Sequence, residues 1–481
     1  MVNTMMTLGT LLLDILPLQA PVAGLQITDV TDDSRQVSEG SLFVAMEGLT
    51  VDGHDYAQVA VDRGAAAVVA ARPLDLSVPC LVVDAPARAL ALALGRLAGD
   101  PAKKLTLLGI TGTNGKTTTT YVMESILATA GRRPGVVGTV GYRYAGTEER
   151  APFTTPTPRV LHQVLGRMVE AGCDHAVMEV SSHALELGRV WGLEFSLAAF
   201  TNLTQDHLDL HGSMELYLQA KLLLFTRHLR PGGCAVINLD GAGHRAFLDA
   251  ARARGDVRVV GCTTRPEVQA EARLLDLHHS IDGLSATLCL GKEQVPLRSP
   301  MPGAYNAENV LLAAACCHAA GVSADQVAHG VAALPGVPGR LERVDGGRDF
   351  AVLVDYAHTP DALERAMAVL RPLCKGRLIV VFGCGGDRDR GKRPLMGAAV
   401  ARGANLGVVT SDNPRTEDPL EIVRAVEEGV RGAGMPRIGD GGGDSDGYIV
   451  EPDRRKAIFW AITRARPGDI VLIAGKGHED Y

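Results

Sequence analysis

The chain has 481 residues, which is enough for roughly two to four domains with sizeable buried cores. Its formal net charge of −7 differs in sign from the basic balance of nucleic-acid-binding proteins, so we expect no nucleic-acid partner. None of the 9 cysteines belongs to a Cys-x-x-Cys pair, which argues against a disulfide framework and against a zinc site.

The N-terminal segment lacks the features of a signal peptide. Its first 17 residues have no basic stretch, and Asp14 interrupts their apolar run, so the pattern predicts an amphipathic helix. No later stretch is long and apolar enough to cross a membrane. We therefore expect a cytoplasmic protein without a membrane span.

Residues 1–103 are predicted to form a small N-terminal α/β domain. Short β-like runs alternate there with helical segments, and Asp100-Pro101 marks the end of the last helix. The expected elements are Ser41–Met46, Tyr56–Arg63, Ala66–Ala70, Cys80–Val83 and Ala87–Ala98.

Residues 104–338 are predicted to form a central P-loop domain with a doubly wound, mostly parallel sheet. Apolar strands alternate there with amphipathic helices, and the Pro- and Gly-rich Leu334–Gly339 segment is the clearest linker. The expected strands are Leu105–Thr111, Gly135–Val140, His175–Val180, Ser196–Asn202 and Cys234–Leu239. The expected helices are Thr117–Ala130, Pro158–Ala171, Ser213–Arg227 and Ala304–Ala315.

Residues 339–481 show the same alternation and are predicted to form a C-terminal Rossmann-like α/β domain. The expected strands are Ala351–Tyr356, Leu378–Phe382, Leu406–Thr410 and Ile470–Ala474. The expected helices lie near residues 361–370, 392–402, 419–431 and 453–464.

The Leu105–Thr120 stretch, LTLLGITGTNGKTTTT, has the order strand, glycine loop with lysine, helix, which is typical of nucleoside triphosphate sites. The glycines let backbone N–H groups approach phosphate oxygens, Lys116 would reach the terminal phosphates, and the Thr117 hydroxyl would meet Mg²⁺. Gly112 lies three residues before Gly115 instead of five, so a chance Gly-Lys-Thr triplet is the alternative. The flanking strand and helix favour ATP binding.

Two polar clusters follow predicted strands, where open α/β sheets place their sites. Glu179 ends one strand shortly before Ser181, at the expected place for a second Mg²⁺-holding acid. The alternative is an exposed glutamate followed by a helix-capping serine. His207 lies between two aspartates in the second cluster, which suits a metal better than a lone histidine does.

Lys221 lies at the centre of an apolar stripe on a predicted helix. Its neighbours on the helix surface are Tyr217, Leu218, Leu224 and Phe225. Burial would lower the pKa of Lys221 and supply the neutral amine that reacts with CO₂. The alternative is that the stem covers apolar surface while the ammonium reaches water, and general physics favours this alternative.

Together these motifs resemble those of the Mur ligases, ATP-dependent amide-forming enzymes that build the peptidoglycan precursor. The resemblance extends from about residue 28 to the end, and points to members that add the third residue to UDP-N-acetylmuramoyl-L-alanyl-D-glutamate. Each motif could arise by chance, whereas their joint occurrence in this order is specific. In chain order the motifs are Asp33-Ser34-Arg35, Gly112–Thr118, Thr154–Thr157, Glu179–His183, Asn202–His211, Ala220-Lys221, Gly303–Asn309, Gly339-Arg340, Asp355–Pro360, Asp412–Arg415 and Gly475–Glu479.

The resemblance implies binding residues in all three predicted domains. Those implied for ATP are Gly112, Thr113, Asn114, Gly115, Lys116, Thr117, Thr118, Asn306, Asn309, Arg340, Asp355 and His358. Those implied for the UDP-muramoyl-dipeptide are Ser34, Leu49, Thr50, Val51, Thr154, Thr155, Ser181 and Arg189. Those implied for diaminopimelate are Arg388, Asp412, Asn413, Pro414, Arg415, Gly475 and Glu479.

The resemblance also implies the chemistry. Lys116, Glu179, His207 and Lys221 would be catalytic, and CO₂ would convert Lys221 into a carbamate (N6-carboxylysine). Mg²⁺ would be held by Thr117, Glu179, His207 and this carbamate. A metal-binding role for Lys221 reverses the preference for a solvent-exposed ammonium. The γ-carboxylate of D-glutamate would attack ATP to give an acyl phosphate and ADP, and the amine of the incoming amino acid would then displace phosphate.

The Asp412-Asn413-Pro414-Arg415 loop matches ligases that use meso-diaminopimelate, whose distal carboxylate Arg415 can bind through two hydrogen bonds. The alternative is the same reaction with L-lysine or L-ornithine, since some ligases with similar loops accept them. A folylpolyglutamate-synthase-like ligase is a further alternative, but it would lack this loop and the Asp33-Ser34-Arg35 domain. A non-enzymatic nucleotide-binding regulator would need only the phosphate loop.

The resemblance implies a monomer that acts on small-molecule substrates. Members of the family usually continue past Gly477–Tyr481 by roughly a strand and a turn. The expectation is therefore a truncated chain or a short terminus, and truncation would leave the last wall of the amino-acid pocket incomplete.

Overall fold

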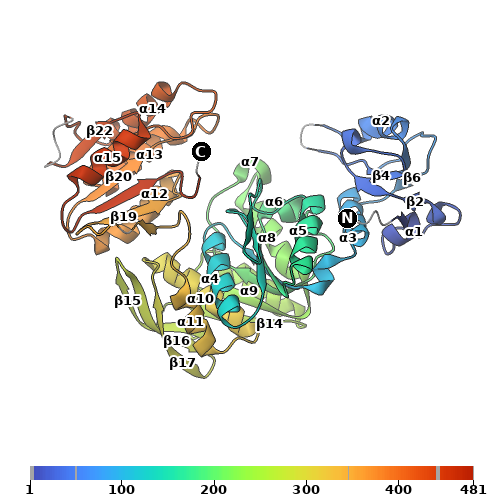
Figure 1. The fold of residues 1–481 in the computed structure, drawn as a ribbon, viewed down its shortest axis with the longest axis horizontal. Coiled ribbons are helices and arrows are strands. Elements are labelled where there is room, and N and C mark those ends of the chain that lie inside the picture. Colours follow the sequence, from blue (N-terminus) through green and yellow to red (C-terminus); the bar gives the residue numbers. More distant parts are fainter. Residues whose placement is uncertain (1–4, 49–50, 345, 440–444, 480–481) are drawn as a thin grey trace. The chain divides into compact units, whose positions relative to one another are not determined.

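The computed structural model describes residues 5–48, 51–344, 346–439 and 445–479. The chain divides into two compact units: Met1–Arg273 with Leu311–Gly330, and Leu274–Val310 with Val331–Tyr481. Mostly parallel sheets with packed helices form both units, as Figure 1 shows, so the predicted α/β class is confirmed. Among the described helices, none has the length and apolarity that a membrane crossing requires.

The first unit begins with a parallel sheet of strand order β3-β4-β5-β6, drawn in blue in Figure 1. Helices α1 and α3 pack on one face of this sheet, and α2 packs on the other face. The elements are α1 (Leu8–Leu11), β3 (Asp29–Thr31), β4 (Ser41–Val44), α2 (Ala57–Asp62), β5 (Ala65–Ala70), β6 (Cys80–Val82) and α3 (Pro86–Leu97).

The prediction of an amphipathic helix over the first 17 residues is wrong in extent. Among the described residues, Met6–Thr7 form strand β1, which pairs with β2 (Gln26–Ile27), and only Leu8–Leu11 are α-helical. Asp14 adopts a left-handed conformation with φ 64°, which an α-helix cannot contain. The apolar residues of this segment instead pack into the core beside α3.

The larger sheet of the first unit has the strand order β10-β9-β8-β11-β7-β12-β13-β14, and β14 pairs with the start of β15. Strands β8, β11, β7, β12 and β13 are parallel, as predicted, and β14 continues the parallel sheet, whereas the β9–β10 hairpin is antiparallel. The predicted strands appear as β7 (Thr106–Thr111), β8 (Pro134–Val137), β11 (His175–Glu179), β12 (Phe195–Phe200) and β13 (Leu229–Asn238). The strands that the sequence analysis missed here are β9 (Tyr142–Tyr144), β10 (Thr147–Glu149), β14 (Arg258–Thr263) and β15 (Ala272–Ser280).

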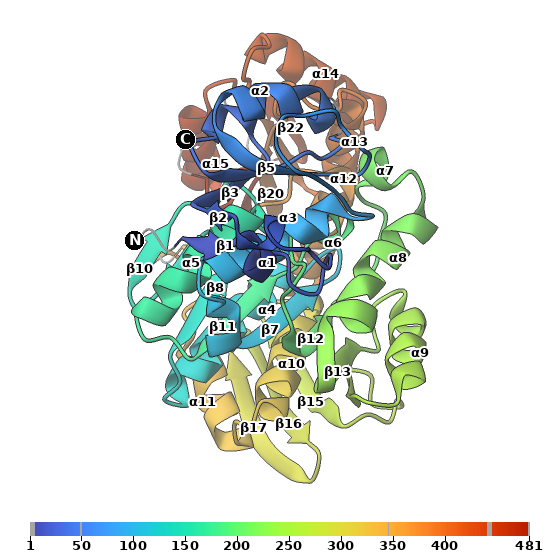
Figure 2. The same cartoon turned by 90° about the vertical axis from the view of Figure 1, so that its right-hand side faces the viewer.

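Helices pack against this sheet, with α4 on β7, β8 and β11, and with α9 beside both β13 and α8 (Figure 2). The further helices of the first unit are α4 (Lys116–Thr129), α5 (Pro158–Glu170), α6 (Ser182–Glu186), α7 (Leu208–His211), α8 (Met214–Leu223) and α9 (His244–Arg254). The unit also contains α10 (Ala304–Ala319) from Leu311 onwards and α11 (Ala324–Ala333) up to Gly330. The predicted Ser213–Arg227 helix is confirmed up to Leu223, and its last part is a π-helix over Leu224–His228. Such π-helical turns are frequent at functional sites.

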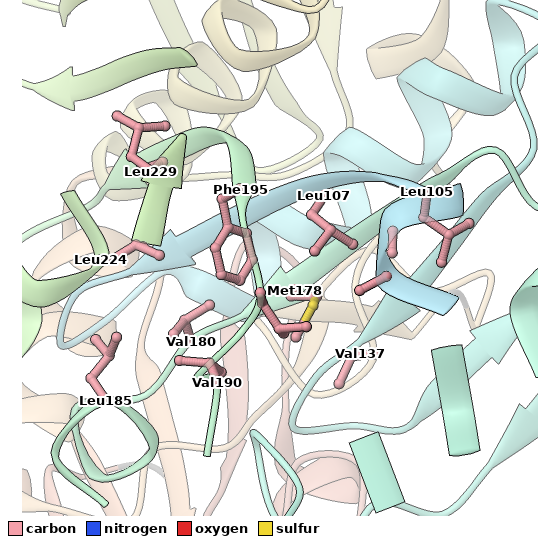
Figure 3. Packing of buried hydrophobic residues seen from close by; sticks show 14 of the residues in the cluster. Leu105, Leu107, Val137, Met178, Val180, Leu185, Val190, Phe195, Leu224 and Leu229 are labelled. Atoms are coloured by element: carbon pink, nitrogen blue, oxygen red, sulfur yellow. The ribbon is translucent and has the colours of Figure 1, made fainter. Parts of the chain in front are cut away.

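A dense apolar core holds β7 in place, and Figure 3 shows the Phe195 ring among Leu107, Met178 and their neighbours. Gly109 of β7 faces this ring. A Cβ atom at Gly109 would lie 2.8 Å from Phe195 Cδ1, so only glycine permits this close approach of strand and ring. The packing fixes the strand that leads directly into the glycine loop.

The second unit contains a sheet of strand order β18-β19-β23-β20-β21-β22, in which only the β18–β19 pair is antiparallel. Helices α12, α13 and α14 cover one face, and α15 covers the other, as predicted for a Rossmann-like domain. The elements are β18 (Glu342–Val344), β19 (Ala351–Asp355), α12 (Pro360–Leu370), β20 (Leu378–Phe382), α13 (Lys392–Gly403), β21 (Leu406–Val409), α14 (Pro419–Gly432), β22 (Gly447–Val450), α15 (Arg454–Arg464) and β23 (Ile470–Ala474). The same unit contains the unpredicted hairpin of β16 (Gly283–Leu290) and β17 (Glu293–Ser299).

Candidate active site

The predicted phosphate loop lies between β7 and α4, as expected. Gly112 and Gly115 have φ values of 145° and 87°, which residues with a Cβ atom rarely adopt. A Cβ atom at Gly112 would lie 1.8 Å from Thr201 Oγ1, so the loop can approach the end of β12 only with glycine there. Both conditions explain why glycines stand at these two positions.

Residues that follow β12 hold the loop in shape, and the sequence analysis assigned them no role. Asn202 Oδ1 accepts a hydrogen bond from the backbone N–H of Asn114 at 3.1 Å, and Asn202 O accepts one from the N–H of Thr113 at 2.8 Å. Thr113 Oγ1 in turn lies 3.2 Å from the Tyr217 hydroxyl of α8. The detectable signal was a polar residue directly after a parallel strand.

Two lysines meet at one carbonyl oxygen of the loop. Lys116 Nζ donates to Gly112 O at 2.9 Å, and Lys221 Nζ of α8 donates to the same atom at 3.0 Å. Lys221 is only 1% exposed, so the alternative in which its ammonium reaches water is wrong. Burial, and after it the charge of Lys116, holds the pKa of Lys221 well below its ordinary value.

A carboxylate and two hydroxyls meet on the other side of the loop. The hydroxyl of Thr117 donates to Glu179 Oε2 at 3.1 Å, and the hydroxyl of Thr139 donates to the same oxygen at 3.0 Å. Glu179 Oε1 accepts from the N–H of Thr139 at 2.9 Å. Glu179 is fully buried at the end of β11, so its alternative as an exposed glutamate is wrong. The sequence analysis missed Thr139, which follows β8.

The four residues expected to hold the dipeptide in this unit lie together around Glu179. Thr154 Oγ1 lies 3.0 Å from Thr139 Oγ1, and Thr155 Oγ1 donates to Glu179 O at 2.8 Å. Ser181 is the N-cap of α6, and its N–H donates to Thr155 Oγ1 at 3.0 Å. Arg189 Nη1 donates to Thr155 O at 3.0 Å, and burial lowers the pKa of this guanidinium.

His207 lies among other rings at the entrance to α7. Its ring is edge-on to that of His183, with centroids 4.6 Å apart, and its Nε2 lies 3.5 Å from an Asp206 oxygen. His207 also has a left-handed backbone with φ 53°. In the part of the chain that the structure describes, no three His, Cys, Asp or Glu side chains gather as a metal site.

In the second unit, the residues expected to bind the amino acid form a connected group. Asn413 Nδ2 donates to Glu479 Oε2 at 2.8 Å, and Asn413 Oδ1 accepts from Lys476 Nζ at 2.7 Å. A Cβ atom at Gly475 would lie 2.6 Å from Asp412 Oδ2, so glycine is required there. The sequence analysis did not assign Lys476, although it lies inside the quoted Gly475–Glu479 motif.

Two arginines border this group. Arg415 has a left-handed backbone with φ 51°, and its Nη1 donates to the carbonyl of Gly386 at 2.7 Å. This bond anchors one edge of the guanidinium. Arg388 is exposed in the neighbouring loop, and its Nη1 donates a hydrogen bond to the carbonyl oxygen of Asp387 at 3.4 Å. Pro414 stands between Asn413 and Arg415 and favours an extended backbone at Asn413.

The remaining residues expected to bind ATP lie in the second unit. Asn306 is fully buried on α10; its Nδ2 donates to Pro302 O at 2.8 Å, and its Oδ1 has no hydrogen-bond partner among the described atoms. Asn309 lies one turn further along the helix. Burial raises the pKa of Asp355 and lowers that of His358. The Arg340 guanidinium lies 5.0 Å from the Tyr356 ring centre.

The residues expected to bind UDP are only partly described. Ser34 begins a short 3-10 helix that Asp33 caps. The carbonyl oxygen of Ser34 accepts a hydrogen bond from Arg63 Nη1 at 2.9 Å. Val51 is exposed. Leu49 and Thr50 lie outside the described residues.

The fold and this site define the class of P-loop, nucleotide-binding α/β proteins with an additional Rossmann-like unit. Three family profiles match successive parts of the chain. They are the Mur ligase family catalytic domain over residues 26–98, the Mur ligase middle domain over 110–317, and the Mur ligase glutamate ligase domain over 339–477. The chain belongs to the Mur ligase family and is a ligase.

Individual relatives agree with this assignment. A Geobacillus thermodenitrificans protein named UDP-N-acetylmuramoyl-L-alanyl-D-glutamate--2,6-diaminopimelate ligase is 45% identical, over 93% of this chain and 89% of its own length. A solved structure of a ligase with that name has a TM-score of 0.74 at 33% identity, covering 99% of this chain and 95% of that one. A Mycobacterium tuberculosis folylpolyglutamate synthase with ADP and AMPPCP has a TM-score of 0.63 at 22% identity, covering 80% of this chain and 91% of that one. The last likeness shows only a shared fold.

The buried Lys221 predicts a specific pH dependence of stability in CO₂-free buffer. Its pKa is lower in the folded state than in the unfolded state, so below the ordinary value of 10.5 the unfolded chain binds more protons. Stability of the wild type therefore falls as pH decreases from 10.5 towards the lowered pKa, by at most about 1.4 kcal/mol per pH unit. We expect Lys221→Met to melt above the wild type by a margin that grows between pH 10 and pH 7.

The control is Lys292→Met, which changes an exposed lysine in the turn between β16 and β17. Its melting temperature should follow that of the wild type at every pH. Differential scanning calorimetry measures all three proteins. A pH-independent difference between Lys221→Met and the wild type would contradict a buried, neutral amine.

Proposed function

We propose that this ligase joins meso-diaminopimelate to the D-glutamate γ-carboxylate of UDP-N-acetylmuramoyl-L-alanyl-D-glutamate, with ATP as the energy source. The observation that carries the proposal is the 45% identity to a ligase of this name over 93% of the chain. The site adds a chemical reason. Its phosphate loop suits a nucleotide, and the separate polar and charged group around Asn413 and Glu479 suits an amino acid.

For the first step, Lys116 and the loop N–H groups hold the ATP phosphates. The Thr154, Thr155, Ser181 and Arg189 group, which touches Glu179, binds the dipeptide. The γ-carboxylate then attacks the γ-phosphate to form an acyl phosphate, and ADP leaves. Such phosphoryl transfer depends mainly on positioning and charge neutralisation, so the enzyme needs no nucleophile of its own.

The residues fit Mg²⁺. Thr117 and Glu179 offer hard oxygen donors 3.1 Å apart in a buried place, which is the donor chemistry that Mg²⁺ prefers. We propose that these two, with His207 and carbamylated Lys221, hold the metal. When bound, Mg²⁺ neutralises charge on the phosphates.

The surroundings of Lys221 fit a carbamate. A neutral amine is the form that reacts with CO₂, and burial favours the neutral form here. The neighbouring Lys116 ammonium, which donates to the same carbonyl, repels a second ammonium but attracts the negative charge of a carbamate. A carbamylated Lys221 would therefore form an attractive charge pair with Lys116, which the neutral amine cannot do.

For the second step, the amine of the incoming amino acid attacks the acyl carbon, and phosphate leaves. We propose that the Asp412–Arg415 loop holds the distal end of diaminopimelate, and that Arg388, Gly475 and Glu479 hold its other end. Arg415 binds the distal carboxylate, while Glu479 and Asn413 form a polar wall. L-Lysine and L-ornithine lack this carboxylate and would place an ammonium beside the Arg415 guanidinium.

Further roles complete the proposal. Asn306, whose buried Oδ1 lacks a partner, suits the exocyclic amine of adenine, and Asn309 lies beside it on α10. Arg340, Asp355 and His358 would contact ribose and phosphates. Ser34, with Leu49, Thr50 and Val51 nearby, would contact the UDP group. We also propose domain bounds of 1–103, 104–338 and 339–481, and a monomeric enzyme.

The carbamate is tested with Lys221→Ala in an assay of phosphate release. We expect the rate to fall on the order of 100-fold or more, because a metal ligand is lost. Added acetate or another small carboxylic acid should restore part of the activity, since the cavity left by the side chain can take a carboxylate. Full activity of Lys221→Ala without added acid would refute the carbamate; Lys292→Ala serves as control.

The choice of amino acid is tested with Arg415→Ala. We expect kcat/KM for diaminopimelate to fall on the order of 1000-fold, because the distal carboxylate loses its cation. The weak reaction with L-lysine should change far less. The control is Arg437→Ala, which removes an exposed arginine paired with Glu427 elsewhere in this unit. Equal losses for both amino acids would count against Arg415 as the specificity residue.

A further inference from the structure

Arg159 of α5 connects two parts of the first unit: the N-terminal sheet β3-β4-β5-β6, and the larger sheet that contains β7 and β11, here called the catalytic sheet, with its helices. It lies in the first turn of α5, and its Nη1 and Nη2 both lie 3.1 Å from Asp29 Oδ1 of β3. Nη2 also donates to Asp29 Oδ2 at 3.0 Å and to the carbonyl oxygen of Val30. One guanidinium thus holds both oxygens of a carboxylate and a backbone carbonyl.

Both ends of this connection lie close in sequence to expected substrate-binding segments. Arg159 follows the Thr154–Thr157 segment, whose Thr155 bonds to Glu179 and Ser181. Asp29 starts the strand that leads to Ser34. Because β3 and the first turn of α5 are regular structure, a bond between them fixes the distance between the two segments.

Arg159 also reduces the negative charge of the segment that it contacts. Burial raises the pKa of Asp32, and the charge of Arg159 opposes this shift. The Asp29–Asp33 segment carries three carboxylates, which would repel the diphosphate of a UDP sugar. The Arg159 guanidinium offsets part of this negative charge and also provides the mechanical link.

We propose that Arg159 is a positioning residue that sets the separation between the UDP-binding segment and the dipeptide-binding loop. This inference rests on the proposed function. A substrate held at both ends gains affinity from the second contact only when the two sites are spaced to match it. Loss of the Arg159–Asp29 contact should therefore weaken binding of the full-length substrate without weakening either half-site.

The chain offers a matched control on the same helix. Arg167 of α5 pairs with Glu149 at 2.7 Å, and these side chains are 40% and 32% exposed. Arg159 and Asp29 pair at 3.0 Å and are 30% and 28% exposed. Glu149 belongs to the β9–β10 hairpin of the catalytic sheet, so Arg167 has a similar ion pair but does not reach the N-terminal sheet.

The test compares two substrates of the full-length enzyme: the UDP-muramoyl-dipeptide, and the muramoyl-dipeptide 1-phosphate, which lacks uridine monophosphate. For Arg159→Met we expect KM for the UDP substrate to rise about tenfold with kcat within about twofold of the wild type. The KM for the 1-phosphate should not change, because that substrate does not span both segments. Arg167→Met should leave both KM values unchanged.

Equal KM increases for both substrates, an unchanged KM for the UDP substrate, or the same effect from Arg167→Met would overturn the proposal. If Arg159→Met does not fold, the exchange variant Arg159→Asp with Asp29→Arg tests the same contact. That variant should recover a KM near the wild-type value, while Arg159→Asp alone should not. A wild type inactive on the UDP substrate would refute the proposed function itself, so the two failures are distinguishable.

Discussion

Two lysine side chains from different helices donate to one backbone oxygen, the carbonyl of Gly112, and the chemistry of the site depends on this contact. Lys116 comes from α4 and Lys221 from α8, at 2.9 and 3.0 Å. Two ammonium groups so close would repel each other in a buried place, so burial and the charge of Lys116 both favour the neutral form of Lys221. In the proposed reaction, the ATP phosphates and a carbamate on Lys221 would both bring negative charge close to the Lys116 ammonium. The contact therefore gives a reason why the proposed reaction uses a nucleotide beside Lys116 and a carbamylated lysine at position 221.

The contact requires exact backbone packing. Gly112 can lie against Thr201 only because it has no Cβ, and β7 is held by the close approach of Gly109 to Phe195. Glu179 at the end of β11 then meets Thr117 at the start of α4, since β11 and β7 pair in parallel register. Loop, acid and lysine are thus placed by strand pairing and by glycines, not by flexible side chains.

Much of the fold was predictable from sequence. The apolar strands β7, β11, β12 and β20 lie within two residues of their expected bounds, because buried parallel strands give clear apolar runs. The hairpins β9–β10 and β16–β17 were missed because polar residues interrupt the apolar runs of their short strands. The N-terminal helix was overestimated because local amphipathicity does not reveal that the helix covers only Leu8–Leu11 and that Asp14 beyond it has a left-handed backbone.

The site was predictable to the extent that its residues follow strands within recognisable motifs. The burial of an individual side chain was harder to predict. The apolar stripe around Lys221 is compatible with a buried or an exposed amine, and only tertiary packing decides between the two. Thr139, Lys476 and Arg159 were missed for a related reason. Their partners Glu179, Asn413 and Asp29 lie 40, 63 and 130 residues away, and one sequence does not pair them.

The most direct measurement of the central claim is amino-acid-dependent phosphate release from ATP by the wild-type chain. The reaction contains UDP-N-acetylmuramoyl-L-alanyl-D-glutamate and, in parallel, meso-diaminopimelate, L-lysine or L-ornithine. We expect kcat/KM for meso-diaminopimelate to exceed the other two values on the order of 1000-fold, with a stoichiometric tripeptide product. Equal rates with L-lysine, or phosphate release that does not depend on the added amino acid, would contradict the assignment.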